Sequence, residues 1–183
     1  MSKIVLIGNT AGSLLNFRKE LIVKLVQQGH TVYCIVSDYT SESKASVKNL
    51  GAIPIDSTLN SKGINPIADI KATIQLSRIL KNLQPDVVFS YFVKPVIFGT
   101  LAAKMANVSR IIGMIEGLGN AFTPKDKNGL DFKTRIIQRI QVLLYKRALP
   151  LLDTLIVLNP DDRKDLVEKY NIKVKNTSVL GGI

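Results

Sequence analysis

The sequence predicts an α/β fold: a Rossmann-like, mostly parallel sheet of about seven strands with helices on both faces. Short apolar runs rich in β-branched residues alternate with longer segments in which apolar residues recur at helical spacing. Glycine or proline separates most neighbouring segments, as at Gly29, Gly51 and Pro85. Because 183 residues, 46% of them hydrophobic, suffice for one substantial core, we expect residues 1–183 to form a single domain.

The first expected strand is the apolar run over residues 3–8, and a glycine-containing turn leads from it into a helix over 14–28. Ser13 is expected to cap this helix. Four apolar residues follow helical spacing and are expected to face the sheet: Leu14, Phe17, Leu21 and Leu25.

The start of this helix is a candidate anion site. Its exposed amides, with Gly12 allowing close approach, suit a phosphate or a carboxylate. Arg18 in the second turn could reach the same ligand as a forked donor, and a solvated surface arginine is the alternative. The spacing from Gly8 to Gly12 departs from the dinucleotide fingerprint, which disfavours a nicotinamide-dependent enzyme.

The chain then continues to alternate. Residues 31–37, which are rich in β-branched and aromatic side chains, are expected to form the second strand, followed by a polar helix over 41–50 and a short strand over 52–56. Asn65-Pro66 is typical of a helix start, so we expect a helix over 66–83. Its inward residues are expected to be Ile67, Ile70, Ile74 and Leu80.

The fourth strand, over 86–90, is expected to lead into a helix over 95–106. Its inward residues are expected to be Phe98, Leu101, Ala102 and Met105. Lys94 lies just ahead of this helix start, where a cation is unfavourable unless an anion joins it. We therefore expect either an anionic ligand at Lys94 or a lysine that extends into water.

The fifth strand, over 111–115, ends in Glu116, which is followed by Gly117 and Gly119. In open parallel sheets, ligands bind outside the carboxyl ends of the strands. Glu116 is therefore expected to point at a ligand, with the two glycines letting the backbone come close to it. The alternative is a tight turn with a solvated glutamate.

Residues 132–148 predict a helix with two faces. Arg135, Arg139 and Lys146 share one face. The apolar residues expected on the opposite face are Ile136, Ile137, Ile140, Leu143 and Leu144. This helix either packs on the sheet with a solvated back or rests its basic face on anionic lipid.

The last elements are expected to be a strand over 153–158, a helix over 161–170 and a strand over 177–180. The glycine pair that follows the last strand is typical of a connection, which suggests that a second domain has been removed.

The composition limits the kinds of ligand and surface that the protein is expected to bind. The net charge of +11 points to phosphate-bearing ligands, nucleic acid or an anionic membrane. Nucleic acid is disfavoured because the cations spread over every helix and aromatic residues make up 6%. The single Cys34 and the single His30 exclude disulfides, thiolate clusters and multi-histidine metal sites, and both are expected to be structural. With no signal peptide and no spanning segment in sight, we expect a cytoplasmic protein.

Three stretches resemble the N-terminal domain of family 4 glycosyltransferases, in the branch that builds bacterial capsule, O-antigen and lipid-linked oligosaccharides: 12–18, 91–99 and 116–123. The resemblance implies one half of a two-domain, B-type enzyme at the inner face of the cytoplasmic membrane. This half would bind the acceptor, commonly a saccharide on undecaprenyl diphosphate, and an absent C-terminal half would bind a nucleotide-sugar donor such as a UDP-sugar. Transfer would retain configuration and need neither metal nor cofactor.

The resemblance also implies roles for residues. Gly12 and Ser13 match the loop that approaches the donor diphosphate, and Glu116, where many members carry His or Thr, faces the reacting sugars as the catalytic candidate. Asn16, Arg18 and Lys94 match motif positions, and their charge or polarity suggests the acceptor phosphate. Further substrate-binding candidates in these stretches are Tyr91, Gly117, Gly119 and Thr123. The domain alone should not catalyse transfer, and the alternative is a stand-alone nucleotide- or nucleic-acid-binding module.

Overall fold

The computed structural model describes residues 1–60, 65–117 and 132–181. Within these ranges seven parallel strands form one sheet, as predicted, and their order is β3-β2-β1-β4-β5-β6-β7. The strands are β1 (Lys3–Ile7), β2 (Thr31–Val36), β3 (Ile53–Asp56), β4 (Val87–Tyr91), β5 (Arg110–Ile115), β6 (Thr154–Val157) and β7 (Thr177–Val179). The strand order reverses between β1 and β4, so the topological switch point lies there.

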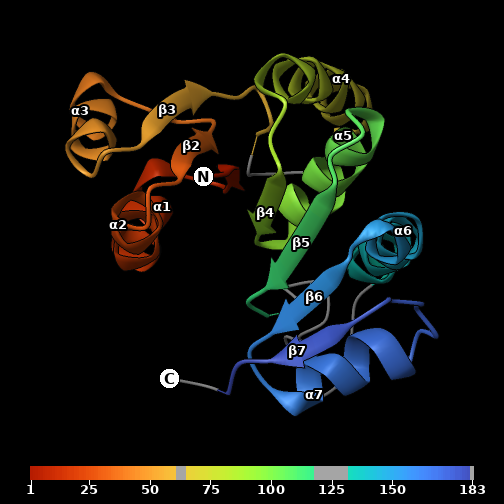
Figure 1. Ribbon diagram of the computed structural model, residues 1–183. Coiled ribbons are helices and arrows are strands. Elements are labelled where there is room, and N and C mark those ends of the chain that lie inside the picture. The colour runs from red at the N-terminus through yellow and green to blue at the C-terminus, as the bar shows by residue number, and fades with distance from the viewer. Residues whose placement is uncertain (61–64, 118–131, 182–183) are drawn as a thin grey trace.

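Helices cover both faces of the sheet (Figure 1). On one face lie α1 (Ala11–Phe17), α2 (Lys19–Gln27) and α3 (Ser41–Asn49). On the other lie α4 (Pro66–Leu83), α5 (Thr100–Met105) and α6 (Phe132–Ala148). Shorter helical pieces are the π-helical turn η1 (Pro95–Gly99), the 3₁₀ turn η2 (Leu149–Leu151), α7 (Pro160–Arg163) and the π-helical turn η3 (Lys164–Glu168).

Two hydrophobic cores lie between the sheet and its helices, one on each face, because successive strand residues point to opposite faces. The core under α4, α5 and α6 includes Val5, Val88 and Ile115, and the core under α1, α2 and α3 includes Leu6, Ile22 and Tyr91. An apolar hollow of about 620 Å³ lies on the face of the sheet that carries α1, α2 and α3. Its lining includes side chains of α1 and α2 and of the strands β1, β4, β5 and β6.

The first helix differs from its predicted form. It begins at Ala11 with Thr10 as its cap, so the prediction of Ser13 as the cap is wrong. Ser13 is the third helical residue: its amide donates to Thr10 Oγ1 at 3.1 Å, and its hydroxyl occupies the reciprocal position of a capping box. The expected continuous helix also breaks at Arg18, whose backbone φ and ψ of −125° and 2° separate α1 from α2.

Several helices bury a different face from the one predicted. Phe17 and Met105 are exposed, and α2 buries Ile22 in place of Leu21. In α4 the exposed fractions of Ile67 and Ile70 are 70% and 58%. Ala72 and Ser77 face the core instead, and Leu80 is buried as predicted. A stripe of small residues lets α4 come closer to its neighbours than a stripe of isoleucines would. The closer packing decides which face is buried, even though the predicted inward face carries isoleucines.

The helix α6 also buries a different face from the one predicted. Tyr145 and Ala148 are buried, while three residues predicted to face the sheet are exposed: Ile136, Ile140 and Leu143.

The structural expectations for the cysteine and the histidine are confirmed. Cys34 is buried in β2, where burial raises the pKa of its thiol to about 12. His30 lies in the turn before β2, and its Nδ1 accepts a hydrogen bond from the Ser2 amide.

Candidate functional site

The carboxyl ends of β1, β4 and β5 lie side by side, because β4 pairs with both of its neighbours. In register, Ile7 lies opposite Ser90, and Tyr91 lies opposite Met114. The residues that follow β1 and β5 therefore meet around the end of β4, at the switch point where ligands bind in open α/β sheets.

Arg18 and Glu116 form an ion pair at this edge. Arg18 Nη2 donates to Glu116 Oε1, and Arg18 Nη1 donates to the carbonyl oxygen of Phe17 at 2.8 Å. The Arg18 guanidinium also lies over the Tyr91 ring, 4.7 Å from its centroid. The two charged side chains are only 11% and 15% exposed, so the pair is well shielded from water. Burial lowers the pKa of Arg18, yet an arginine remains protonated at neutral pH.

Tyr91 forms the floor beneath this pair. It is fully buried, and its ring packs against Phe92 with centroids 5.4 Å apart. Burial raises the pKa of the Tyr91 hydroxyl, so it stays protonated. A Cβ atom on Gly8 would lie 2.8 Å from Tyr91 Cε2 and closer still to the hydroxyl, so the tyrosine requires glycine there. Phe92 has a φ of +69°, an uncommon conformation for a bulky residue and one that often marks functional sites.

The chain itself occupies much of the predicted anion site at the start of α1. Asp38, two residues after the end of β2, accepts a hydrogen bond from the Ala11 amide at 2.7 Å. The Ser13 amide donates to Thr10 Oγ1. Two of the first three amides of α1 are thus already bound to oxygen atoms of the protein. Gly12, between them, is exposed, and a Cβ atom placed there would meet nothing within 4 Å.

The anion expected beside Lys94 is a side chain of the protein itself, the Asp69 carboxylate. Lys94 Nζ donates to Asp69 Oδ1 at 2.8 Å and to the Asn60 carbonyl oxygen at 2.9 Å. The Asp69 side chain, from the first turns of α4, is only 5% exposed. Lys94 is therefore held toward α4, so the structure does not bring it together with Arg18 and Glu116. The alternative of a lysine extended into water is wrong.

The remaining predicted residues lie around the strand edge. Asn16 is exposed on α1, and Gly117 has a φ of +122°, a conformation that favours glycine. Gly119 and Thr123 lie outside the described residues. Sequence reasoning missed Asp38, although it lies just beyond the carboxyl end of β2 and the rule that selected Glu116 would have selected it too.

The predicted lipid-facing side of α6 is exposed. Arg135, Arg139 and Lys146 all lie at the surface. At 100° per residue, an exposed apolar stripe runs beside them rather than opposite to them. This stripe consists of Phe132, Ile136, Ile140 and Leu143. The helix contains no acidic residue.

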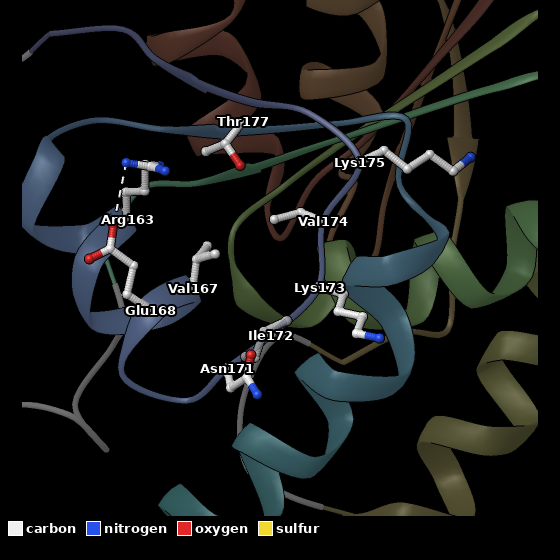
Figure 2. Close-up of a pocket in the computed structure, with 9 residues that line it drawn as sticks. All are labelled: Arg163, Val167, Glu168, Asn171, Ile172, Lys173, Val174, Lys175 and Thr177. Atoms are coloured by element: carbon white, nitrogen blue, oxygen red, sulfur yellow. Dashed lines mark ion pairs between the residues drawn. The ribbon is translucent and has the colours of Figure 1, made fainter.

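A separate hollow of about 710 Å³ lies at the outer edge of the sheet, between η3 and β7 (Figure 2). Arg163 pairs with Glu168 at 3.4 Å, and Lys175 pairs with Asp153 at 2.8 Å. Figure 2 shows the side chains of Lys173 and Lys175 pointing away from the Arg163–Glu168 pair. Because its charged groups do not converge, this hollow is a weaker candidate than the strand edge.

Over 1–60, 65–117 and 132–181, no group of three or more histidine, cysteine, aspartate or glutamate side chains is placed to hold a metal ion. Within the same ranges, each helix is too short or too polar to cross a membrane.

Comparisons of the sequence with known proteins match glycosyltransferases. The family model for glycosyl transferase 4-like proteins matches residues 3–159. A curated relative from Campylobacter jejuni, N,N'-diacetylbacillosaminyl-diphospho-undecaprenol alpha-1,3-N-acetylgalactosaminyltransferase, is 25% identical over 99% of this chain. The chain spans 46% of the length of that relative.

Solved structures resemble the chain in fold. A glycosyltransferase from Rickettsia africae has a TM-score of 0.64 and 18% identity over 98% of this chain and 42% of its own. A UDP-N-acetylglucosamine 2-epimerase has a TM-score of 0.65 and 15% identity, covering 99% of this chain and 48% of its own. The fold therefore corresponds to rather less than half of each of these proteins.

Proposed function

Because the chain belongs to the glycosyl transferase 4-like family, we propose that it is the acceptor-binding half of a retaining glycosyltransferase. The enzyme would move a sugar from a nucleotide-sugar donor, a UDP-sugar in the first instance, to a saccharide on undecaprenyl diphosphate. Its product would serve capsule, O-antigen or related polysaccharide synthesis. The observation that carries the proposal is the shielded Glu116 carboxylate at the switch point of this family's fold.

The described side chains suggest how this half would work. Glu116 would accept a hydrogen bond from the acceptor hydroxyl, since a carboxylate is a strong acceptor and has two oxygen atoms. Gly12 and Ser13 would face the donor diphosphate from across the cleft, where the open space beside Gly12 admits a close approach. Tyr91 would support Arg18 from below rather than touch the sugar, because it is fully buried.

We propose in addition that the layer of α4 and α6 rests on the anionic inner surface of the cytoplasmic membrane. The exposed apolar stripe of α6 beside Arg135, Arg139 and Lys146 supports this, because interfacial helices insert apolar residues while lysine and arginine reach the head groups. On the same side of the sheet, α4 exposes three isoleucines and three cations: Ile67, Ile70, Ile74, Lys71, Arg78 and Lys81. A lipid-linked acceptor would then be reached at its own surface.

A transfer assay tests the enzymatic proposal. The complete protein would be incubated with a panel of UDP-, GDP- and dTDP-sugars and with undecaprenyl-diphosphate-linked saccharides, and the product's anomeric configuration read by NMR. We expect transfer with retention, and a loss of about 10²-fold or more in the Glu116→Gln variant. A panel without any transfer would contradict the proposal, and inverted products would contradict its retaining mechanism.

Vesicle sedimentation tests the membrane proposal. We expect binding to vesicles containing anionic lipid and little binding to neutral ones. Changing Arg135, Arg139 and Lys146 to glutamate should abolish most of it, since each cation near the surface contributes about 1 kcal/mol. The matched control changes Lys19, Lys24 and Lys48, which are exposed on α2 and α3, to glutamate. Equal loss in both triple variants would indicate a net-charge effect without a specific face.

The alternative is a stand-alone nucleotide- or nucleic-acid-binding module. A salt-dependent shift of a labelled oligonucleotide by this chain at physiological ionic strength would favour it. Transfer that needs a second half would argue against it.

A further inference from the structure

The geometry points to Arg18 as a positioning residue that holds the Glu116 carboxylate for a neutral sugar hydroxyl, rather than as a contact for phosphate. This inference rests on the proposed function and deepens it. It names the chemistry that the Arg18–Glu116 pair recognises, an uncharged hydroxyl, and it reassigns a cation whose charge alone suggests a phosphate ligand.

The Arg18 guanidinium is held from several directions. Nη1 donates to the carbonyl oxygen of Phe17, and the guanidinium lies over the Tyr91 ring. Nη2 donates to Glu116 and lies 3.6 Å from Met114 Sδ. The break between α1 and α2 at Arg18 turns its side chain toward β5. A guanidinium restrained in this way has one orientation, so it fixes the position of the carboxylate that it binds.

Glu116 depends on Arg18 for its own position. It lies at the end of β5, just before Gly117, whose φ of +122° turns the chain away. Within the described ranges, its side chain has Arg18 as its hydrogen-bond partner. The Glu116 side chain is 15% exposed with Arg18 in place, and removing the guanidinium would leave its carboxylate free to rotate about its side-chain torsions.

The charges of the Arg18–Glu116 pair favour a neutral ligand beside it, because Arg18 is already neutralised by Glu116. A phosphate that approached Arg18 would bring its charge beside Glu116, and the like charges would repel each other in a shielded site. A sugar hydroxyl can instead donate to the second carboxylate oxygen while the ion pair stays intact.

Four variants of the complete protein test the inference: Arg18→Ala, Arg18→Lys, Glu116→Gln and the charge swap Arg18→Glu with Glu116→Arg. We expect Arg18→Ala to lower kcat by about 10²-fold, as a displaced catalytic group does, with KM for the acceptor within about threefold. Methylguanidinium should restore part of the activity of Arg18→Ala, and lysine should restore less. The charge swap should recover the melting temperature but not kcat.

The outcomes separate the competing roles. Recovery of both kcat and the melting temperature by the charge swap would mean that the pair is merely structural, which overturns the inference. A raised KM with an unchanged kcat in Arg18→Ala would mean a contact made equally in the ground state, which also overturns it. Absence of transfer in the unmodified protein would overturn the proposed function instead.

An NMR measurement judges Arg18 independently of transfer. The Nε–Hε signal of Arg18, assigned by its loss in Arg18→Lys, should shift in Glu116→Gln and should not respond to inorganic pyrophosphate. A saturable shift with pyrophosphate would identify Arg18 as a phosphate contact and overturn the inference.

Discussion

Replacing Gly12 with alanine separates ligand contact from folding. Gly12 is the second residue of α1, is exposed, and would place its new Cβ atom where nothing lies within 4 Å. Its φ lies outside the left-handed region. Alanine is favoured over glycine within a helix by about 0.5–1 kcal/mol, so the variant should be unchanged in stability or slightly more stable.

Transfer should nevertheless fall. If a donor diphosphate approaches the backbone at Gly12, the added methyl group occupies its path and weakens a hydrogen bond to a charged group, which is worth about 1.5–3 kcal/mol. At 1.4 kcal/mol for each factor of ten, kcat/KM for the donor should fall about 10- to 100-fold. Steady-state kinetics would be measured beside urea denaturation of the same sample.

Gly8→Ala is the matched control, because its Cβ atom would overlap the Tyr91 ring and hydroxyl. It should destabilise the fold by about 1–3 kcal/mol or more through overpacking, so its loss of activity would follow its loss of stability. A Gly12→Ala variant that is stable and fully active would refute the reasoning, since no ligand could then lie close to that backbone.

Two further predictions concern buried groups. Lys94→Met should lower the free energy of unfolding by about 3–5 kcal/mol, because it leaves the Asp69 carboxylate buried without its cation. Adding Asp69→Asn should recover part of this loss in urea denaturation, and additive losses would contradict a coupled pair. Because burial raises the pKa of Cys34 from 9.0 to about 12, the unfolded chain loses this proton at a lower pH than the folded chain. Stability should therefore fall as the pH rises from about 9 toward 12, and this component should vanish in Cys34→Ala.

The order and type of the elements could be predicted because apolar runs bounded by glycine and proline leave little ambiguity. The helix expected over 132–148 has the bounds of α6, and the strand expected over 153–158 contains β6. The face that each helix buries could not be predicted as well. In α4, apolar residues lie on several sides, and the choice depends on how closely Ala72 and Ser77 let the helix approach its neighbours, which one sequence does not reveal.

The candidate site was predictable in part. The rule that ligands lie beyond the carboxyl ends of strands selected Glu116, the helix after β1 selected Arg18, and the family resemblance added Tyr91. The pairing of Arg18 with Glu116 was not predictable, because 98 positions separate the two residues in the sequence. The sequence position of Asp69, in the first turns of a helix where an acid complements the helix dipole, does not indicate its pairing with Lys94, because that pairing depends on the tertiary fold.

These pairings determine which parts of the surface carry the excess positive charge of this chain, whose net charge is +11. Arg18 and Lys94 pair with carboxylates within the chain. The sequence of α6 contains no acid, and its exposed residues include five cations: Lys133, Arg135, Arg139, Lys146 and Arg147. A large anionic surface would then be recognised by the helical layer, and the Arg18–Glu116 pair would recognise a neutral hydroxyl. Salt should distinguish the two. Raising the ionic strength from about 0.05 to 0.5 M shortens electrostatic reach severalfold, so kcat/KM should fall for an acceptor held in anionic vesicles. It should change little for a short-chain acceptor in solution, and equal loss with both would refute the separation.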